Sequence, residues 1–142
     1  MSAYADTSFL VSLYAPDANS VEAASRMRRM ALPVIVTPFG ELELANALQL
    51  RLFRRELLAA QTRAAYAAFR DDVTAGIFEI KPISDDVYTQ ARRLAQRWST
   101  TLGTRTLDIL HVASAMALAA ESFHTFDERQ RRLAKAVKLT VR

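Results

Sequence analysis

Strand-like segments alternate with helical segments along the whole chain, and this alternation most narrows the folds open to it. Residues 33–38 ("PVIVTP") and 77–82 ("IFEIKP") are short apolar runs bounded by proline, typical of buried strands. Between them, residues 39–54 and 56–75 carry apolar side chains at helical spacing, and Gly76 is placed to end the second helix. The pattern predicts an α/β domain with a mainly parallel sheet and helices on both faces.

The same alternation extends to both ends of the sequence. Residues 2–8 ("SAYADTS") predict a short strand that ends at Asp6, followed by a helix that stops before Pro16. Further helices are predicted at residues 19–30, 84–98, 106–120 and 128–136, and further strands at residues 122–126 and 138–141. No repeat or long linker interrupts the pattern, so residues 1–142 are predicted to form a single domain of about five strands.

Composition limits the chemistry available to the chain. It has no cysteine, which excludes a disulfide framework and thiolate metal ligands. The longest apolar run, residues 106–120, is too short for a membrane span and is interrupted by Asp108 and His111. We therefore expect a cytoplasmic protein with no membrane partner. The net charge of +4 is compatible with a polyanionic partner but does not identify one.

An acidic residue interrupts the most apolar helix of the sequence. Residues 106–120 ("TLDILHVASAMALAA") leave no continuous polar face, yet Asp108 lies in the first turn. A lone buried carboxylate is unfavourable, so Asp108 should cap the helix, pair with a cation or hold a metal.

Three further acids fall at comparable places in the predicted fold. Asp6 ends the first strand, Asp127 follows the fourth, and Glu43 lies early in the helix after the second. Because sites in open parallel sheets lie at the carboxyl ends of strands, we expect these acids and Asp108 to meet at one edge. An all-oxygen ligand set favours Mg²⁺ or Mn²⁺. Such an ion can activate water for attack on a phosphodiester.

Each acid also has a simpler explanation. Asp6 and Asp127 could each cap the helix that follows, and Asp108 could be a first-turn acid favoured by the helix dipole. Glu43 could be an ordinary solvated residue beside Glu41. Their joint occurrence at the ends of successive elements favours a shared site.

Four segments resemble one family of nucleases. They are "ADTSFLVSLY" (5–14), "ELELANALQLR" (41–51), "TLDILHVASA" (106–115) and "FHTFDERQ" (123–130). Together and in this order they resemble the motifs of PIN-domain ribonucleases over nearly the whole chain. The size of the chain resembles that of VapC-type toxins from bacterial toxin–antitoxin pairs.

The resemblance implies a three-layer α/β/α sandwich around a central, mainly parallel sheet. It also implies Mg²⁺- or Mn²⁺-dependent endonucleolytic cleavage of single-stranded regions of RNA. Asp6, Glu43, Asp108 and Asp127 match the family's acidic positions, and Asp6 and Asp108 are the expected direct metal ligands. The expected partners are the RNA substrate, a small cognate antitoxin that inserts an arginine into the acidic cluster, and a second copy of the chain.

Several neighbouring residues are candidates for secondary roles. His111 lies three residues after Asp108, and we expect it to pack structurally rather than bind metal, while His124 receives no role. Supporting hydroxyls are expected from Thr7, Ser8 and Thr125. Phosphate contacts could come from the arginines Arg51, Arg54, Arg55, Arg92, Arg93, Arg97 and Arg105, of which Arg105 is nearest to Asp108 in sequence.

Other functions remain open at the level of sequence. A phosphoryl-transfer enzyme on a similar sheet is one, although aspartyl-phosphate phosphatases need a second aspartate two residues after the first, where this chain has Ser8. A non-catalytic RNA- or partner-binding PIN domain is another, which the four intact acids disfavour. Phe53, Leu57 and Leu58 could form a docking or dimer surface, or could belong to the core.

Overall fold

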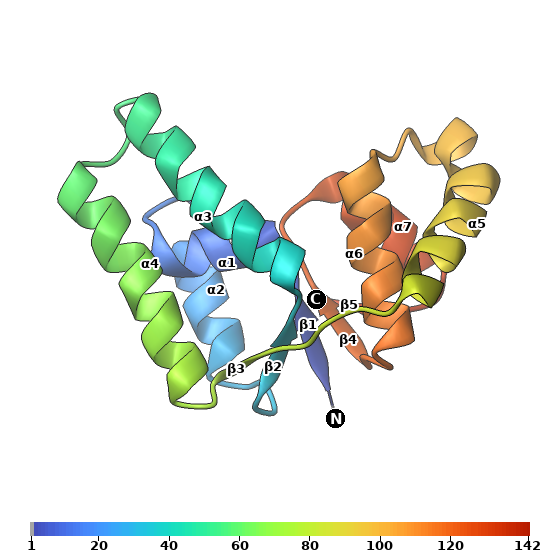
Figure 1. The fold of residues 1–142 in the computed structure, drawn as a ribbon, viewed down its shortest axis with the longest axis horizontal. Coiled ribbons are helices and arrows are strands. Elements are labelled where there is room, and N and C mark those ends of the chain that lie inside the picture. Colours follow the sequence, from blue (N-terminus) through green and yellow to red (C-terminus); the bar gives the residue numbers. More distant parts are fainter. Residues whose placement is uncertain (1) are drawn as a thin grey trace.

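A computed structural model describes residues 2–142 and contains a five-stranded, all-parallel sheet (Figure 1). The strand order is β3-β2-β1-β4-β5. The strands are β1 (Ala3–Ala5), β2 (Val34–Val36), β3 (Phe78–Ile80), β4 (Ser122–His124) and β5 (Thr140–Val141). The predicted α/β class and mainly parallel sheet are confirmed.

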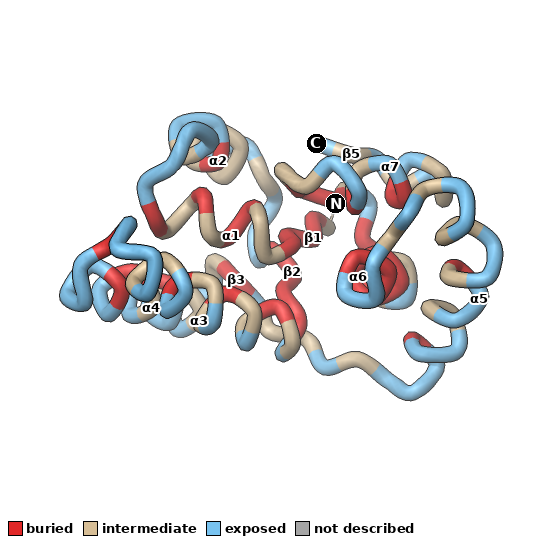
Figure 2. Tube along the Cα trace, turned by 90° about the horizontal axis from the view of Figure 1, so that it is seen from above, coloured by how far each residue is buried: buried red, intermediate tan, exposed pale blue. Residues whose placement is uncertain are grey.

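Seven helices pack on this sheet within the described residues. They are α1 (Thr7–Tyr14), α2 (Ser20–Met27), α3 (Pro38–Phe53), α4 (Ala59–Thr74), α5 (Asp85–Leu102), α6 (Thr106–Ala117) and α7 (Glu128–Ala136). Helices α1 to α4 lie on one side of the sheet and α5 to α7 on the other, which completes the three layers (Figures 1 and 2).

Two hydrophobic clusters fill the spaces between the layers, and the strands alternate between them. Val34 and Val36 of β2 face the cluster under α1 to α4, whereas Ile35 faces the cluster under α5 to α7. In β1, Ala3 and Ala5 face the first cluster and Tyr4 faces the second. Both faces of the central strands are therefore buried, as the apolar "VIV" run predicted.

The position of helix α6 in the fold accounts for its apolar composition. It packs against α5 and α7 beside the sheet, and every residue from Asp108 to Ala115 is buried (Figure 2). Such a helix has no solvent-facing stripe, so the usual polar face is missing.

Element boundaries differ slightly from the predictions. β4 ends at His124 rather than Phe126, because the next two residues leave the sheet. The Thr125 hydroxyl donates to Asp6, and the Phe126 N–H donates to the Ser8 hydroxyl. Helix α6 ends at Ala117, and Ala119 has a positive φ of 55°. Leu57 is part of the core, whereas Phe53 and Leu58 are exposed. Within residues 2–142, no helix has the length and apolar character needed to span a membrane.

Candidate active site at the carboxyl edge of the sheet

Asp6 follows directly after β1 and is completely buried. It caps α1, because its Oδ1 accepts hydrogen bonds from the Phe9 N–H at 2.9 Å and from the Ser8 hydroxyl at 2.7 Å. Its Oδ2 accepts a third hydrogen bond from the Thr125 hydroxyl. The capping role is therefore real, and the same carboxylate also contacts a residue 119 positions away in sequence.

Thr125 reaches Asp6 because β1 and β4 are parallel neighbours in register. Ala5 pairs with His124, so the residues that follow them leave the sheet side by side. The Thr125 Oγ1 also accepts a hydrogen bond from the Asp127 N–H at 2.9 Å. One hydroxyl thus connects Asp6 with the segment that carries Asp127.

Asp108 and Asp127 are connected through a glutamine on α7. Asp127 caps α7, and its Oδ1 accepts a hydrogen bond from the Gln130 N–H at 3.1 Å. The Gln130 side-chain amide donates to Asp108 Oδ1 at 3.2 Å, and the Arg105 N–H donates to Asp108 Oδ2 at 2.9 Å. Asp108 and Gln130 are both buried, so these contacts hold the start of α6 against the start of α7.

Glu43 joins the same region through a buried histidine. Its Oε1 accepts a hydrogen bond from the Thr7 hydroxyl at 2.8 Å and lies 2.5 Å from His111 Nε2. The Tyr4 hydroxyl lies 2.8 Å from His111 Nδ1. Burial raises the pKa of Tyr4, so this hydroxyl keeps its proton. The Glu43 carboxylate accepts from His111 Nε2–H, and the contacts with Glu43 and Tyr4 together fix the plane of the imidazole ring.

His111 itself is fully buried, as predicted for a packing residue. Both of its ring nitrogens have protein partners, and its ring packs against Phe39 at a centroid distance of 4.6 Å. His111 therefore orients Glu43.

These contacts place the four predicted acids on one edge of the molecule. Asp6, Asp127 and Asp108 form one hydrogen-bonded series through Thr125 and Gln130. Thr7, the residue after Asp6, hydrogen-bonds to Glu43 and so connects the fourth acid to the same edge. The acids come from both helical layers: Asp6 and Glu43 from the α1 and α3 side, and Asp108 and Asp127 from the α6 and α7 side.

The environment of Asp6 suits a positively charged ligand. Burial raises the pKa of Asp6 above its ordinary value. The nearby His111 and the hydrogen bonds from Thr125, Phe9 and Ser8 act in the opposite direction without cancelling the rise. A cation beside the carboxylate would stabilise the ionised form.

The residues present fit a divalent ion in their chemistry. Among residues 2–142, no three acidic or histidine side chains lie close enough together to share one ion. Mg²⁺ does not need such a cage, because proteins usually hold it by one or two carboxylates with waters and substrate phosphates. Asp6 and Asp108 supply carboxylates, and the buried Gln130 Oε1 beside Asp108 has no hydrogen-bond partner in the described part of the chain.

The predicted supporting residues differ in how closely they join the site. Thr7, Ser8 and Thr125 all hydrogen-bond to an acidic side chain of the site. Arg105 is peripheral, because its guanidinium Nε lies 3.8 Å from Asp108 Oδ2 and its side chain is 67% exposed.

Gln130 and Tyr4 were not identified from the sequence. Gln130 lies in the basic segment "ERQRRLAKA", where nothing marks one polar residue as inward-facing. The sequence feature that could have identified Gln130 is its position three residues after the helix cap Asp127. At that spacing the Gln130 side chain lies on the same side of the first helical turn as the cap. Tyr4 gave no signal within a strand of three residues.

The fold and the site together define the class of this protein: it is an α/β/α protein with four linked acids at the carboxyl edge of its parallel sheet. The PIN domain family model matches residues 3–136, and the chain belongs to that family. Two solved structures share its fold. Mycobacterium tuberculosis VapC20, a toxin that cleaves the sarcin–ricin loop, is 19% identical, with a TM-score of 0.73 over 97% of this chain and 96% of that chain. FitAcB from Neisseria gonorrhoeae is 17% identical, with a TM-score of 0.68 over 99% and 96% of the two chains.

The predicted membership of the PIN family and the likeness in fold to a VapC-type toxin are thus confirmed. No curated protein sequence matches the chain significantly.

Proposed function

We propose that this protein is a metal-dependent endoribonuclease that cleaves single-stranded regions of RNA and acts as the toxin of a toxin–antitoxin pair. The observation that carries the proposal is the hydrogen-bonded edge that joins Asp6, Asp108 and Asp127, with Glu43 beside it. The family match and the likeness to VapC20 support a nuclease over other uses of an acidic edge.

In this proposal the acids have separate roles. Asp6 and Asp108 hold Mg²⁺ or Mn²⁺, which when bound lowers the pKa of a water and offsets the charge of the phosphodiester. Thr125 and Gln130 orient these two carboxylates through the hydrogen bonds described above. Glu43, fixed by His111 and Thr7, and Asp127 shape the surrounding charge and can accept protons from waters.

The partners follow from the same proposal. A cytoplasmic toxin needs a cognate antitoxin, and an antitoxin arginine directed at the acidic edge would pair with its carboxylates. Large apolar side chains are exposed on α3 and the segment after it, namely Leu42, Leu50, Phe53 and Leu58, which supports a protein partner or a homodimer on that surface.

The test is cleavage of a pool of single-stranded RNA oligonucleotides by the purified protein. We expect cleavage with Mg²⁺ or Mn²⁺ and none with EDTA. Asp6→Asn and Asp108→Asn should each reduce the rate by about 100-fold or more, which is about 2.7 kcal/mol in the barrier. Asparagine also caps helices, so Asp6→Asn should keep its fold and its thermal midpoint.

The matched control is Asp71→Asn, which removes an exposed carboxylate on α4 and should cleave like the wild type. Cleavage that persists in EDTA or in folded Asp6→Asn would contradict the proposal. Binding of RNA without any cleavage would favour the non-catalytic alternative.

A further inference from the structure

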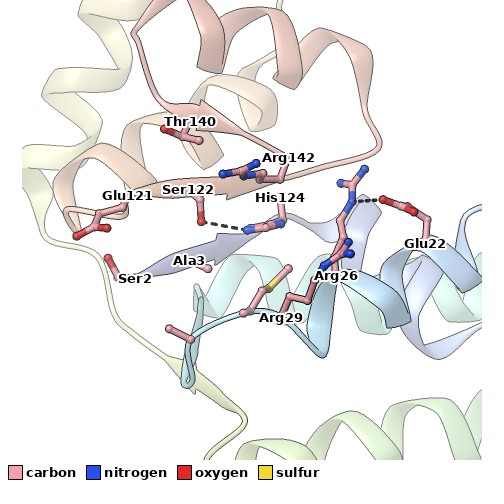
Figure 3. A pocket seen from close by; sticks show the side chains of 12 residues that line it. Ser2, Ala3, Glu22, Arg26, Arg29, Glu121, Ser122, His124, Thr140 and Arg142 are labelled. Atoms are coloured by element: carbon pink, nitrogen blue, oxygen red, sulfur yellow. Dashed lines mark hydrogen bonds and ion pairs between the residues drawn. The ribbon is translucent and has the colours of Figure 1, made fainter.

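A cavity of about 610 Å³ lies on the open part of the sheet, and none of the four acids of the acidic edge lines it. Its wall includes Ala3 of β1, Ser122 and His124 of β4, Thr140 of β5 and the end of α2 (Figure 3). The volume is within the range of small-ligand sites.

The cavity exists because the first helical layer does not extend over the last strands. In β4, Phe123 faces the cluster under α5 to α7, so Ser122 and His124 point to the opposite face. That face is covered near β1 and β2 by α1 and α2, whereas β5 has only the second cluster behind it. On this face Ser122 and His124 line the cavity, and the His124 ring also packs against Phe9 of α1 at a centroid distance of 5.7 Å.

Basic side chains dominate one end of this cavity. This end is lined by His124, by Arg26 near the end of α2, by Arg29 just after that helix and by Arg142 after β5, while Glu121 lies at the other end (Figure 3). Arg26 pairs with Glu22 at 2.8 Å. Within residues 2–142, neither Arg29 nor Arg142 forms an ion pair, so this end keeps an excess of positive charge.

Among the described residues 2–142, two buried nitrogen atoms of cavity-lining side chains have no hydrogen-bond partner. They are His124 Nδ1 and Arg26 Nη1. The Ser122 hydroxyl lies 3.0 Å from His124 Nε2, and when it donates there the proton of the neutral ring is on Nδ1. Desolvation and the charges of Arg26 and Arg142 lower the pKa of His124 to about 4, so the ring is neutral at physiological pH.

The basic end of the cavity adjoins the acidic edge. The Arg26 guanidinium lies 4.8 Å from the centroid of the Phe126 ring, and Phe126 stands between Thr125 and Asp127. Arg142 is held to the same segment by backbone hydrogen bonds with Phe123 at 3.0 Å and Thr125 at 3.4 Å. Arg26 and Arg142 of the cavity therefore lie beside the segment that carries Thr125 and Asp127.

We propose that this cavity binds a backbone phosphate of the RNA substrate, next to the nucleotide at the acidic edge. The proposal rests on the ribonuclease function proposed above. Arg29 and Arg142 supply charge-assisted hydrogen bonds to the phosphate oxygens, and Arg26 and His124 line the cavity beside them. The site thereby holds the strand on one side of the scissile bond.

The test measures binding of a short fluorescent single-stranded RNA by anisotropy in EDTA, where no metal-dependent cleavage occurs. Arg29→Gln and Arg142→Gln should each weaken binding by about 5- to 10-fold. Each should also reduce the slope of log affinity against log salt by about 0.7, the value for one lost contact to a single strand. Both arginines are exposed, so these variants should fold normally.

The control is Arg63→Gln, which removes the same charge from an exposed position on α4 and should bind RNA like the wild type. An equal loss of affinity in all three variants, or no loss in any of them, would overturn the proposal. A wild type that binds RNA through this cavity but never cleaves it would refute the ribonuclease function and leave the phosphate site standing.

A second measurement separates RNA from free phosphate. The imidazole resonances of His124 are followed by NMR during titration with inorganic phosphate and with the same RNA. Shifts produced by RNA and lost in Arg142→Gln support the proposal. Shifts produced by inorganic phosphate alone would assign the cavity to a small anion and overturn the RNA assignment.

Discussion

At the scale of single residues, Gln130 is the contact that joins two of the proposed catalytic acids. Its backbone N–H satisfies Asp127, and its side chain satisfies Asp108. A hydrogen bond to an ionised group contributes roughly 1.5–3 kcal/mol, and a buried carboxylate that loses one keeps its desolvation penalty. Gln130 is therefore expected to act by positioning Asp108.

We expect Gln130→Met to raise the Mg²⁺ concentration for half-maximal cleavage by about 10-fold. Methionine has a similar length and keeps the backbone cap but cannot donate to Asp108. Titration of the cleavage rate with Mg²⁺ measures the effect. A purely structural role for Gln130 would instead lower the thermal midpoint and leave the Mg²⁺ dependence unchanged.

The comparison variant is Gln96→Met, which makes the same exchange at an exposed position on α5. It should leave both the Mg²⁺ dependence and the thermal midpoint close to those of the wild type.

At the scale of elements, α6 has both a structural role in the core and a proposed catalytic role through Asp108. Its buried small residues allow close packing in the second layer, and the same helix positions Asp108 and His111. Close-packed interiors do not absorb added volume without displacing neighbours. Packing of this helix and geometry of the site are therefore coupled.

Ala113→Leu should reduce the free energy of unfolding by about 1–3 kcal/mol, the usual effect of overpacking a core. Ala113 is completely buried, so the added carbon atoms must displace α6 or its neighbours. Urea denaturation measures the change. Ala117→Leu adds the same atoms at an exposed position of α6 and should change the stability by less than about 0.5 kcal/mol.

At the scale of the whole molecule, the acidic edge lies where the two helical layers meet. The contacts Asp6 to Thr125 and Glu43 to His111 each join a residue from the first layer to one from the second layer or the strand beside it. Stability and site geometry consequently depend on the same long-range contacts, and titration of buried groups near the sheet affects the entire fold.

Acid should destabilise the protein partly through His124. Its pKa is about 4 in the folded protein and about 6.5 in the unfolded chain, so the unfolded state binds the proton first as the pH falls. Its contribution, up to about 2–3 kcal/mol, is complete above pH 6.5 and is lost between pH 6.5 and 4. Unfolding free energies measured by urea denaturation across this range test the effect.

The comparison that isolates this group is His124→Gln, which cannot titrate. The unfolding free energy of the wild type minus that of this variant should become smaller or more negative as the pH falls from 7 to 4. Asp6 acts in the opposite direction, because its raised pKa favours the protonated folded state, but it does so equally in both proteins. A difference that is constant with pH would contradict the expected titration of His124.

Most of the fold was predictable because its signals are local. Prolines around "VIV", the glycine after the fourth helix and helical spacing each depend on neighbouring residues, and the predicted elements match the observed ones to within a few residues. The ends of β4 and α6 were less predictable, because a contact of Thr125 with Asp6 and a turn at Ala119 decide them.

The sequence by itself determined the alternation of strands and helices, the parallel sheet and the acids that follow successive strands. Only the tertiary structure decided which groups hold those acids: Thr125 for Asp6, Gln130 for Asp108 and His111 for Glu43. It also decided that a cavity lies against Ser122 and His124 of β4. The physical reason is range, because backbone preferences and periodicity act over a few residues, whereas these contacts join residues as far as 119 positions apart.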